Sequence, residues 1–97
     1  MKRVVHYRVL TDSRGNGVLN EELRALLIPG TVIWILYSML QPLKGEWFGF
    51  HSVVQSFVLY IKTSGRLEKW EDEHWLQIQV ALAELVEFGA LEVREFD

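Results

Sequence analysis

The stretch that decides the fold of this chain is VALAELVEFGALEVR, residues 80–94. Leu82 and Leu85 lie three residues apart, so they share one face of a helix. Gly89 follows, and glycine readily adopts the left-handed conformation that commonly ends a helix. Beyond it, apolar residues alternate with charged ones, which is the period of a strand. The stretch therefore predicts an amphipathic helix that stops at a glycine and returns as a strand.

Extended backward, the predicted helix begins near Asp72 and ends at Phe88, and the strand covers 90–96. Glu71, Asp72 and Glu73 stand at the amino end of the helix, where its dipole favours negative charge. The predicted apolar face consists of Trp75, Ile78, Leu82, Leu85 and Val86.

The first part of the chain predicts a strand and a loop. Residues 3–10 alternate, with Val5, Tyr7 and Val9 on one face, which is typical of a strand with one wetter side. Residues 11–17 are rich in Asp, Ser, Asn and Gly, which favour turns. We expect the N-terminal strand to pair with the final strand.

Capping residues predict the next two elements. Asn20 begins a short helix from Glu21 to Leu27 or Ile28, and Pro29-Gly30 ends it. Thr31 begins an apolar segment that runs to Leu40. This segment is predicted as a helix or as a buried strand, because Val, Ile, Trp and Tyr favour strands.

A short strand over 46–50 is expected next, and Ser52 is expected to cap a helix over 53–62. The apolar stripe of this helix consists of Val53, Val54, Phe57, Val58 and Ile61. Residues 66–74 are predicted as a charged loop that leads into the last helix.

With these elements in order, residues 80–94 resemble the end of a winged helix-turn-helix domain. In that family, a recognition helix closes with leucines and a glycine, and a short apolar strand then enters the wing. The matching positions are Leu82, Leu85, Gly89, Leu91 and Val93. The resemblance implies a small winged-helix-like α+β domain, with three to four helices and a small antiparallel sheet, over residues 1–97. The turn before the last helix, about ten residues, is longer than the family's ~3–4.

Composition limits the functions open to this chain. Its 97 residues are 49% hydrophobic and include no cysteine, which excludes disulfides and thiolate chemistry and favours a reducing, cytoplasmic location. The apolar segment 31–40 would span only ~15 Å as a helix, about half a bilayer core, so we expect no membrane anchor. Glu71 and His74 have the spacing of half a carboxylate metal site, but no second pair accompanies them. His6, Asp12 and Ser13 supply the residue types of a hydrolase triad without support for its geometry. We expect no enzyme, no metal and no cofactor.

Charge is divided unevenly along the chain. Residues 1–63 carry seven Lys/Arg and four Asp/Glu, and residues 64–97 carry three and nine, so the two parts have net charges of +3 and −6. The outward face of the last helix, expected to hold Glu73, Gln77, Val80, Ala81, Glu84, Glu87 and Phe88, has no Lys or Arg. Glutamates there would repel a DNA duplex, because phosphate neutralisation supplies most non-specific affinity.

We therefore expect a non-enzymatic binding protein that engages a protein partner with a basic surface. A small, cysteine-free chain of this kind suits an accessory protein of a virus, such as a phage, or of a mobile element, for example an inhibitor of a host nucleic-acid machine. The candidate contact residues are Glu68, Trp70, Glu71, Asp72, Glu73, Gln77, Val80, Glu84 and Phe88. Tryptophans beside acids suit anchoring on a basic surface. The same residues also have purely structural explanations. The acids stand at the amino end of a helix, where its dipole favours negative charge. Trp75 fits a core position, and a neighbouring element could cover Phe88.

The alternative function is a winged-helix regulator that binds duplex DNA. Its candidate contacts lie in the basic part of the chain, at Arg3, Arg8, Arg14 and Lys62. Arg14 adjoins a glycine-flanked loop whose backbone amides could cradle phosphate, although basic residues scattered in this way are also typical of an ordinary solvated surface. A homodimer would suit this regulator, and the hydrophobic residues Trp34, Trp47 and Phe48 leave room for a self-association surface.

Overall fold

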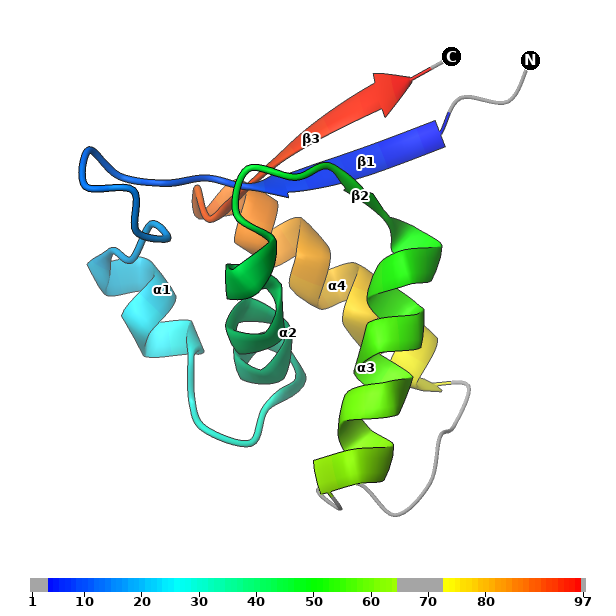
Figure 1. Cartoon of the computed structure of the whole chain (residues 1–97). Helices are drawn as coiled ribbons and strands as arrows, with labels where there is room; N and C mark the ends of the chain where they lie inside the picture. Colours follow the sequence, from blue (N-terminus) through cyan, green and yellow to red (C-terminus); the bar gives the residue numbers. More distant parts are fainter. Residues whose placement is uncertain (1–3, 65–72, 97) are drawn as a thin grey trace.

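The computed structural model describes residues 4–64 and 73–96 (Figure 1). Its elements, in chain order, are β1 (Val4–Val9), α1 (Glu21–Leu26), α2 (Val32–Leu40), the 3-10 turn η1 (Gln41–Leu43), β2 (Phe48–Gly49), α3 (Phe50–Ser64), α4 (Glu73–Glu87) and β3 (Leu91–Phe96). The predicted class is confirmed: over the described residues, this is a small α+β domain with four helices and one antiparallel sheet.

The sheet joins the two ends of the described chain. Its strand order is β2-β1-β3, and both pairings are antiparallel. β1 and β3 pair over six residues, from Val4 opposite Phe96 to Val9 opposite Leu91, which confirms the expected pairing of the first and last strands. Only His6 and Tyr7 pair with β2. The helices lie beneath the sheet in Figure 1, and β1 and β3 extend past them as a two-stranded ribbon.

Side-chain caps begin the first two helices. The side-chain oxygen of Asn20 accepts from the Leu23 amide at 2.9 Å, and Thr31 Oγ1 accepts from the Trp34 amide at 3.3 Å. Such bonds satisfy amides that have no partner within the helix. Residues 32–40 are therefore helical, and the strand alternative for this segment is wrong.

The start of α3 corrects the predicted boundary. Ser52 lies inside the helix, which begins at Phe50. Phe50 and His51 both contact the ring of Trp75 on α4, with centroids 5.4 and 6.3 Å away. Packing against α4 thus accompanies three additional helical residues, nearly one turn, that a capping rule does not predict.

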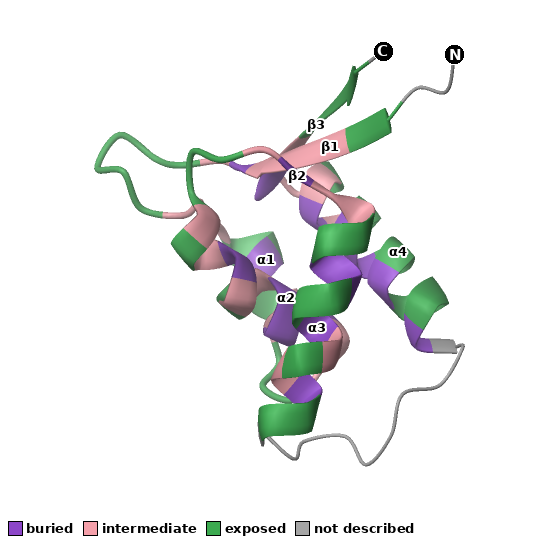
Figure 2. Ribbon diagram, turned by 45° about the vertical axis from the view of Figure 1, so that its right-hand side comes forward, coloured by how far each residue is buried: buried purple, intermediate pink, exposed green. Residues whose placement is uncertain are grey.

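The core lies between the sheet and the inner faces of the helices, shown as buried segments in Figure 2. Leu23 of α1, Leu36 of α2, Phe57 of α3 and Ile78 of α4 are fully buried. Val9 and Leu91 add the buried end of the ribbon. Gly89 ends α4 with φ +84°, the left-handed conformation predicted for it.

Candidate protein-binding groove

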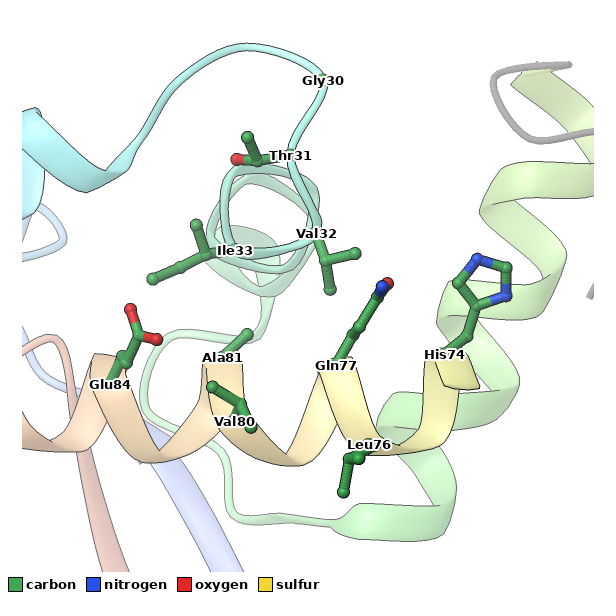
Figure 3. Close-up of a pocket in the computed structure, with 10 residues that line it drawn as sticks. All are labelled: Gly30, Thr31, Val32, Ile33, His74, Leu76, Gln77, Val80, Ala81 and Glu84. Atoms are coloured by element: carbon green, nitrogen blue, oxygen red, sulfur yellow. The ribbon is translucent and has the colours of Figure 1, made fainter. Parts of the chain in front are cut away.

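The first turn of α2 and the outward face of α4 enclose an open groove of about 780 Å³ (Figure 3). Gly30, with φ +92°, turns the chain into α2, and Thr31 Oγ1 donates to the Ile28 carbonyl at 2.7 Å. These features fix the first turn of α2 beside α4. The lining residues are Gly30, Thr31, Val32, Ile33, His74, Leu76, Gln77, Val80, Ala81 and Glu84.

The groove is apolar along most of its length and acidic at one end. Figure 3 shows Gln77 and Glu84 extending from α4 toward α2, with Val32 and Ile33 extending back. Leu76 is 64% exposed and Val80 is 51% exposed. Among the described residues that line the groove, Glu84 is the only acid, and none is Lys or Arg. The groove can therefore accept an apolar side chain flanked by a cation.

Two aromatic residues define the amino end of α4. His74 is buried, with its ring centroid 6.4 Å from that of Phe57. Trp75 is 36% exposed, so its predicted place in the core is wrong. It packs on Phe50 and His51 and forms an aromatic edge between α3 and α4.

The structure places only some of the predicted contact residues in the groove. Gln77, Val80 and Glu84 line the groove together. Glu68, Trp70, Glu71 and Asp72 lie outside the described residues, and Glu73 is the first residue of α4.

Two residues placed on the outward face of α4 do not belong there. Phe88 is half-buried and packs against the core, and Ala81 is 4% exposed. The prediction that these two side chains are exposed is wrong, because neighbouring elements cover them. Of the predicted contact residues that the structure describes, we therefore retain Gln77, Val80 and Glu84, and we add Leu76, which also lines the groove.

The structure does not bring the predicted DNA contacts together. Arg3 lies outside the described residues. Arg8 forms a salt bridge with Glu92, which offsets its charge. Arg14 lies in the loop after β1, and Lys62 lies near the carboxyl end of α3. Figure 1 shows that loop and that end of α3 on opposite sides of the molecule.

A cluster on the outer face of the sheet was not predicted. The guanidinium groups of Arg8 and Arg94 lie 4.6 and 5.1 Å from the Trp47 ring centroid, and Phe96 meets that ring edge-on at 5.5 Å. His6 packs on Phe96 at 5.0 Å. Trp47 comes from a loop with no sequence period, so only the register of β1 and β3 reveals the cluster.

One residue considered for a hydrolase triad is hydrogen-bonded within its own loop. Asp12, considered for a triad with His6 and Ser13, accepts from the amides of Arg14 and Asn16 within its own loop. Across the described residues, no group of three His, Asp or Glu side chains could hold a metal ion. Burial raises the pKa of Tyr7 and of Tyr37. The Tyr37 hydroxyl donates to the Val18 carbonyl at 3.0 Å.

Comparison with known proteins gives no match to any protein-family model, any curated protein or any solved structure. None of the helices, over the residues that the structure describes, has the length and apolar character needed to cross a membrane.

Proposed function

We propose that this chain is a non-enzymatic binding protein whose groove between α2 and α4 holds a segment of a protein partner. The observation that carries the proposal is the exposure of Leu76 and Val80 on a helix face without Lys or Arg. Exposing apolar side chains to water is unfavourable in free energy. An apolar patch with a polar rim is typical of a protein interface.

The charge around the groove selects the chemistry of the partner segment. Glu84 lies at one end of the groove, Glu87 follows one turn later on the exposed side, and residues 64–97 carry a net charge of −6. A segment with an apolar side chain beside Lys or Arg would bury the first against Val80 and pair the second with Glu84. A basic protein, such as one that handles nucleic acids, offers such segments.

A displayed library of random peptides tests the proposal without a known partner. The library is selected on the immobilised protein and compared with two matched variants, Leu76→Arg and Leu59→Arg. Both leucines are 64% exposed, but Leu76 lines the groove and Leu59 lies on α3. We expect enriched peptides that combine an apolar residue with Lys or Arg, and loss of their binding in the Leu76 variant alone. Equal binding to both variants would overturn the assignment of the groove.

The second candidate function is duplex-DNA binding by a winged-helix-like domain. What favours it is the arrangement of α2, α3 and α4 followed by β3, with β1 pairing beside β3 where the family has a second wing strand. What opposes it is the acidic outward face of α4, because groove-reading helices approach phosphate. Eight residues separate α3 from α4, also more than the family's turn of ~3–4.

Fluorescence anisotropy of a labelled random-sequence duplex separates the two candidates. We expect no binding at low salt. Binding that weakens steeply as salt rises, and that falls in an Arg14→Ala or Lys62→Ala variant, would favour the DNA function instead.

A further inference from the structure

We infer that two copies of this chain associate through the free edge of β3 and join their sheets into one. β3 is an edge strand in the order β2-β1-β3, and its six residues pair with β1 without a bulge. β3 contains no proline. Natural edge strands are usually protected by prolines, bulges, brevity or charged side chains, because an open edge pairs readily with another strand. Of these protections, β3 has only its charged side chains, Glu92, Arg94 and Glu95, and the opposite signs of Glu92 and Arg94 allow them to pair with a second copy.

The hydrogen-bond pattern shows which backbone groups point to the free edge. The Leu10 amide donates to the Ala90 carbonyl at 3.0 Å, so this pair is a hydrogen-bonded pair of the ladder. Hydrogen-bonded and non-hydrogen-bonded pairs alternate in antiparallel sheets. Arg8–Glu92 and His6–Arg94 are therefore hydrogen-bonded pairs, and the amides and carbonyls of Val93 and Glu95 point away from β1.

The side chains of β3 select a single register for a symmetric dimer. Side chains that face each other across an antiparallel pair lie on the same face of the sheet, so the two-fold axis must pass through a residue. An axis at Glu92, Arg94 or Glu95 would set like charges directly opposite each other, which is destabilising. An axis at Leu91 or Phe96, the two ends of β3, would leave almost none of the strand paired with its copy. An axis at Val93 sets valine against valine and places Glu92 opposite Arg94 of the second copy, twice.

Exposure is consistent with that register. Val93 is 47% exposed, and Val4, Val5 and Phe96 at the outer end of the ribbon are between 36% and 50% exposed. Figure 2 shows this end of β1 and β3 as exposed. By contrast, Phe48 is buried and Trp34 is half-buried against the core, so neither is free to form the self-association surface first suggested by their hydrophobicity.

Sedimentation velocity from about 5 µM to about 500 µM tests the inference, because self-association depends on protomer concentration. We expect wild-type protein to pass from monomer to dimer over this range. Val93→Pro removes only an outward amide and should remain monomeric, with its fold checked by circular dichroism. A wild type that stays monomeric, or a folded Val93→Pro variant that dimerises like wild type, would overturn the inference.

Charge exchange tests the register itself. Arg94→Glu and Glu92→Arg each create like-charge pairs across the axis, so each variant alone should be monomeric. Because Glu92→Arg also replaces the salt bridge with Arg8 by a like-charge pair, the fold of both variants is first checked by circular dichroism. Mixed together, they restore both opposite-charge pairs, and we expect a heterodimer. Failure of the folded variants to associate on mixing would contradict the Val93 register.

If a variant does not fold, hydrogen exchange of the wild-type protein tests the β3 interface instead. The Val93 amide should gain protection as protein concentration rises, whereas the Arg94 amide, bonded to β1, should be protected throughout. Protection at Val93 that does not change with concentration while the protein dimerises would place the interface elsewhere.

Discussion

The side-chain amide of Asn20 donates to the backbone carbonyl of Phe88 at 2.9 Å, which ties the start of α1 to the end of α4 across 68 positions of sequence. Its oxygen simultaneously accepts from the Leu23 amide and caps α1. One residue thus begins a helix and closes the fold, and its two roles can be separated by substitution.

Asn20→Ala removes both bonds and is expected to lower the free energy of unfolding by about 1–3 kcal/mol. Asn20→Ser keeps a capping oxygen but is too short to reach Phe88, so it should cost about half as much. Urea denaturation of the three proteins measures the difference. A Ser variant as stable as wild type would show that the tie to Phe88 contributes nothing.

Docking of α1 depends on Leu23, which is fully buried. Leu23→Ala should cost about 2–5 kcal/mol, from lost burial and the cavity left behind. Ile28 lies just beyond the helix and is 59% exposed, so Ile28→Ala should change stability by less than about 0.5 kcal/mol. Thermal and urea unfolding compare the pair, and similar losses in both would contradict the packing of α1 described above.

Gly89→Ala tests the turn from α4 into β3. Gly89 has φ +84°, and a Cβ built there meets no atom within 4 Å, so the cost comes from the backbone alone. We expect a loss of about 1–2 kcal/mol. Gly49, where φ is not positive and a Cβ would meet the His6 ring at an ordinary 3.9 Å, is the control. Gly49→Ala should be neutral or slightly stabilising, and an equal loss at both sites would refute the conformational explanation.

Stability at alkaline pH should depend on Tyr7. Burial raises its pKa in the folded state above the ordinary value of 10.0, so the fold favours the neutral phenol. This contribution is complete below the unfolded pKa and is lost as pH rises through the raised folded pKa. In melting temperatures recorded from about pH 9 to about pH 11.5, Tyr7→Phe should therefore decline less steeply than wild type. Parallel declines would show that Tyr7 ionises without penalty.

The sequence predicts elements whose signals are local. Asn20, Thr31 and Gly89 each mark a helix end by capping or by left-handed backbone, and the structure places the ends there. Alternation predicts both long strands, and their pairing was expected because the final strand needs a neighbour.

The remaining features depend on contacts between distant segments. α3 begins before Ser52 because Phe50 and His51 pack on Trp75 of another helix. Helical geometry placed Ala81 and Phe88 outward, but adjoining elements bury them. For the groove, the sequence indicated Gln77, Val80 and Glu84, whereas the part contributed by Val32 and Ile33 follows only from the position of α2 beside α4.

The most direct test of the central claim is to titrate isotope-labelled protein with the peptide enriched on wild-type protein and to follow its amide resonances. We predict saturable shifts concentrated at Val32, Leu76, Val80 and Glu84, with Leu59 and Arg14 unchanged. Shifts concentrated at Arg8, Arg14 and Lys62, or a selection that yields no peptide specific for the groove, would contradict the account.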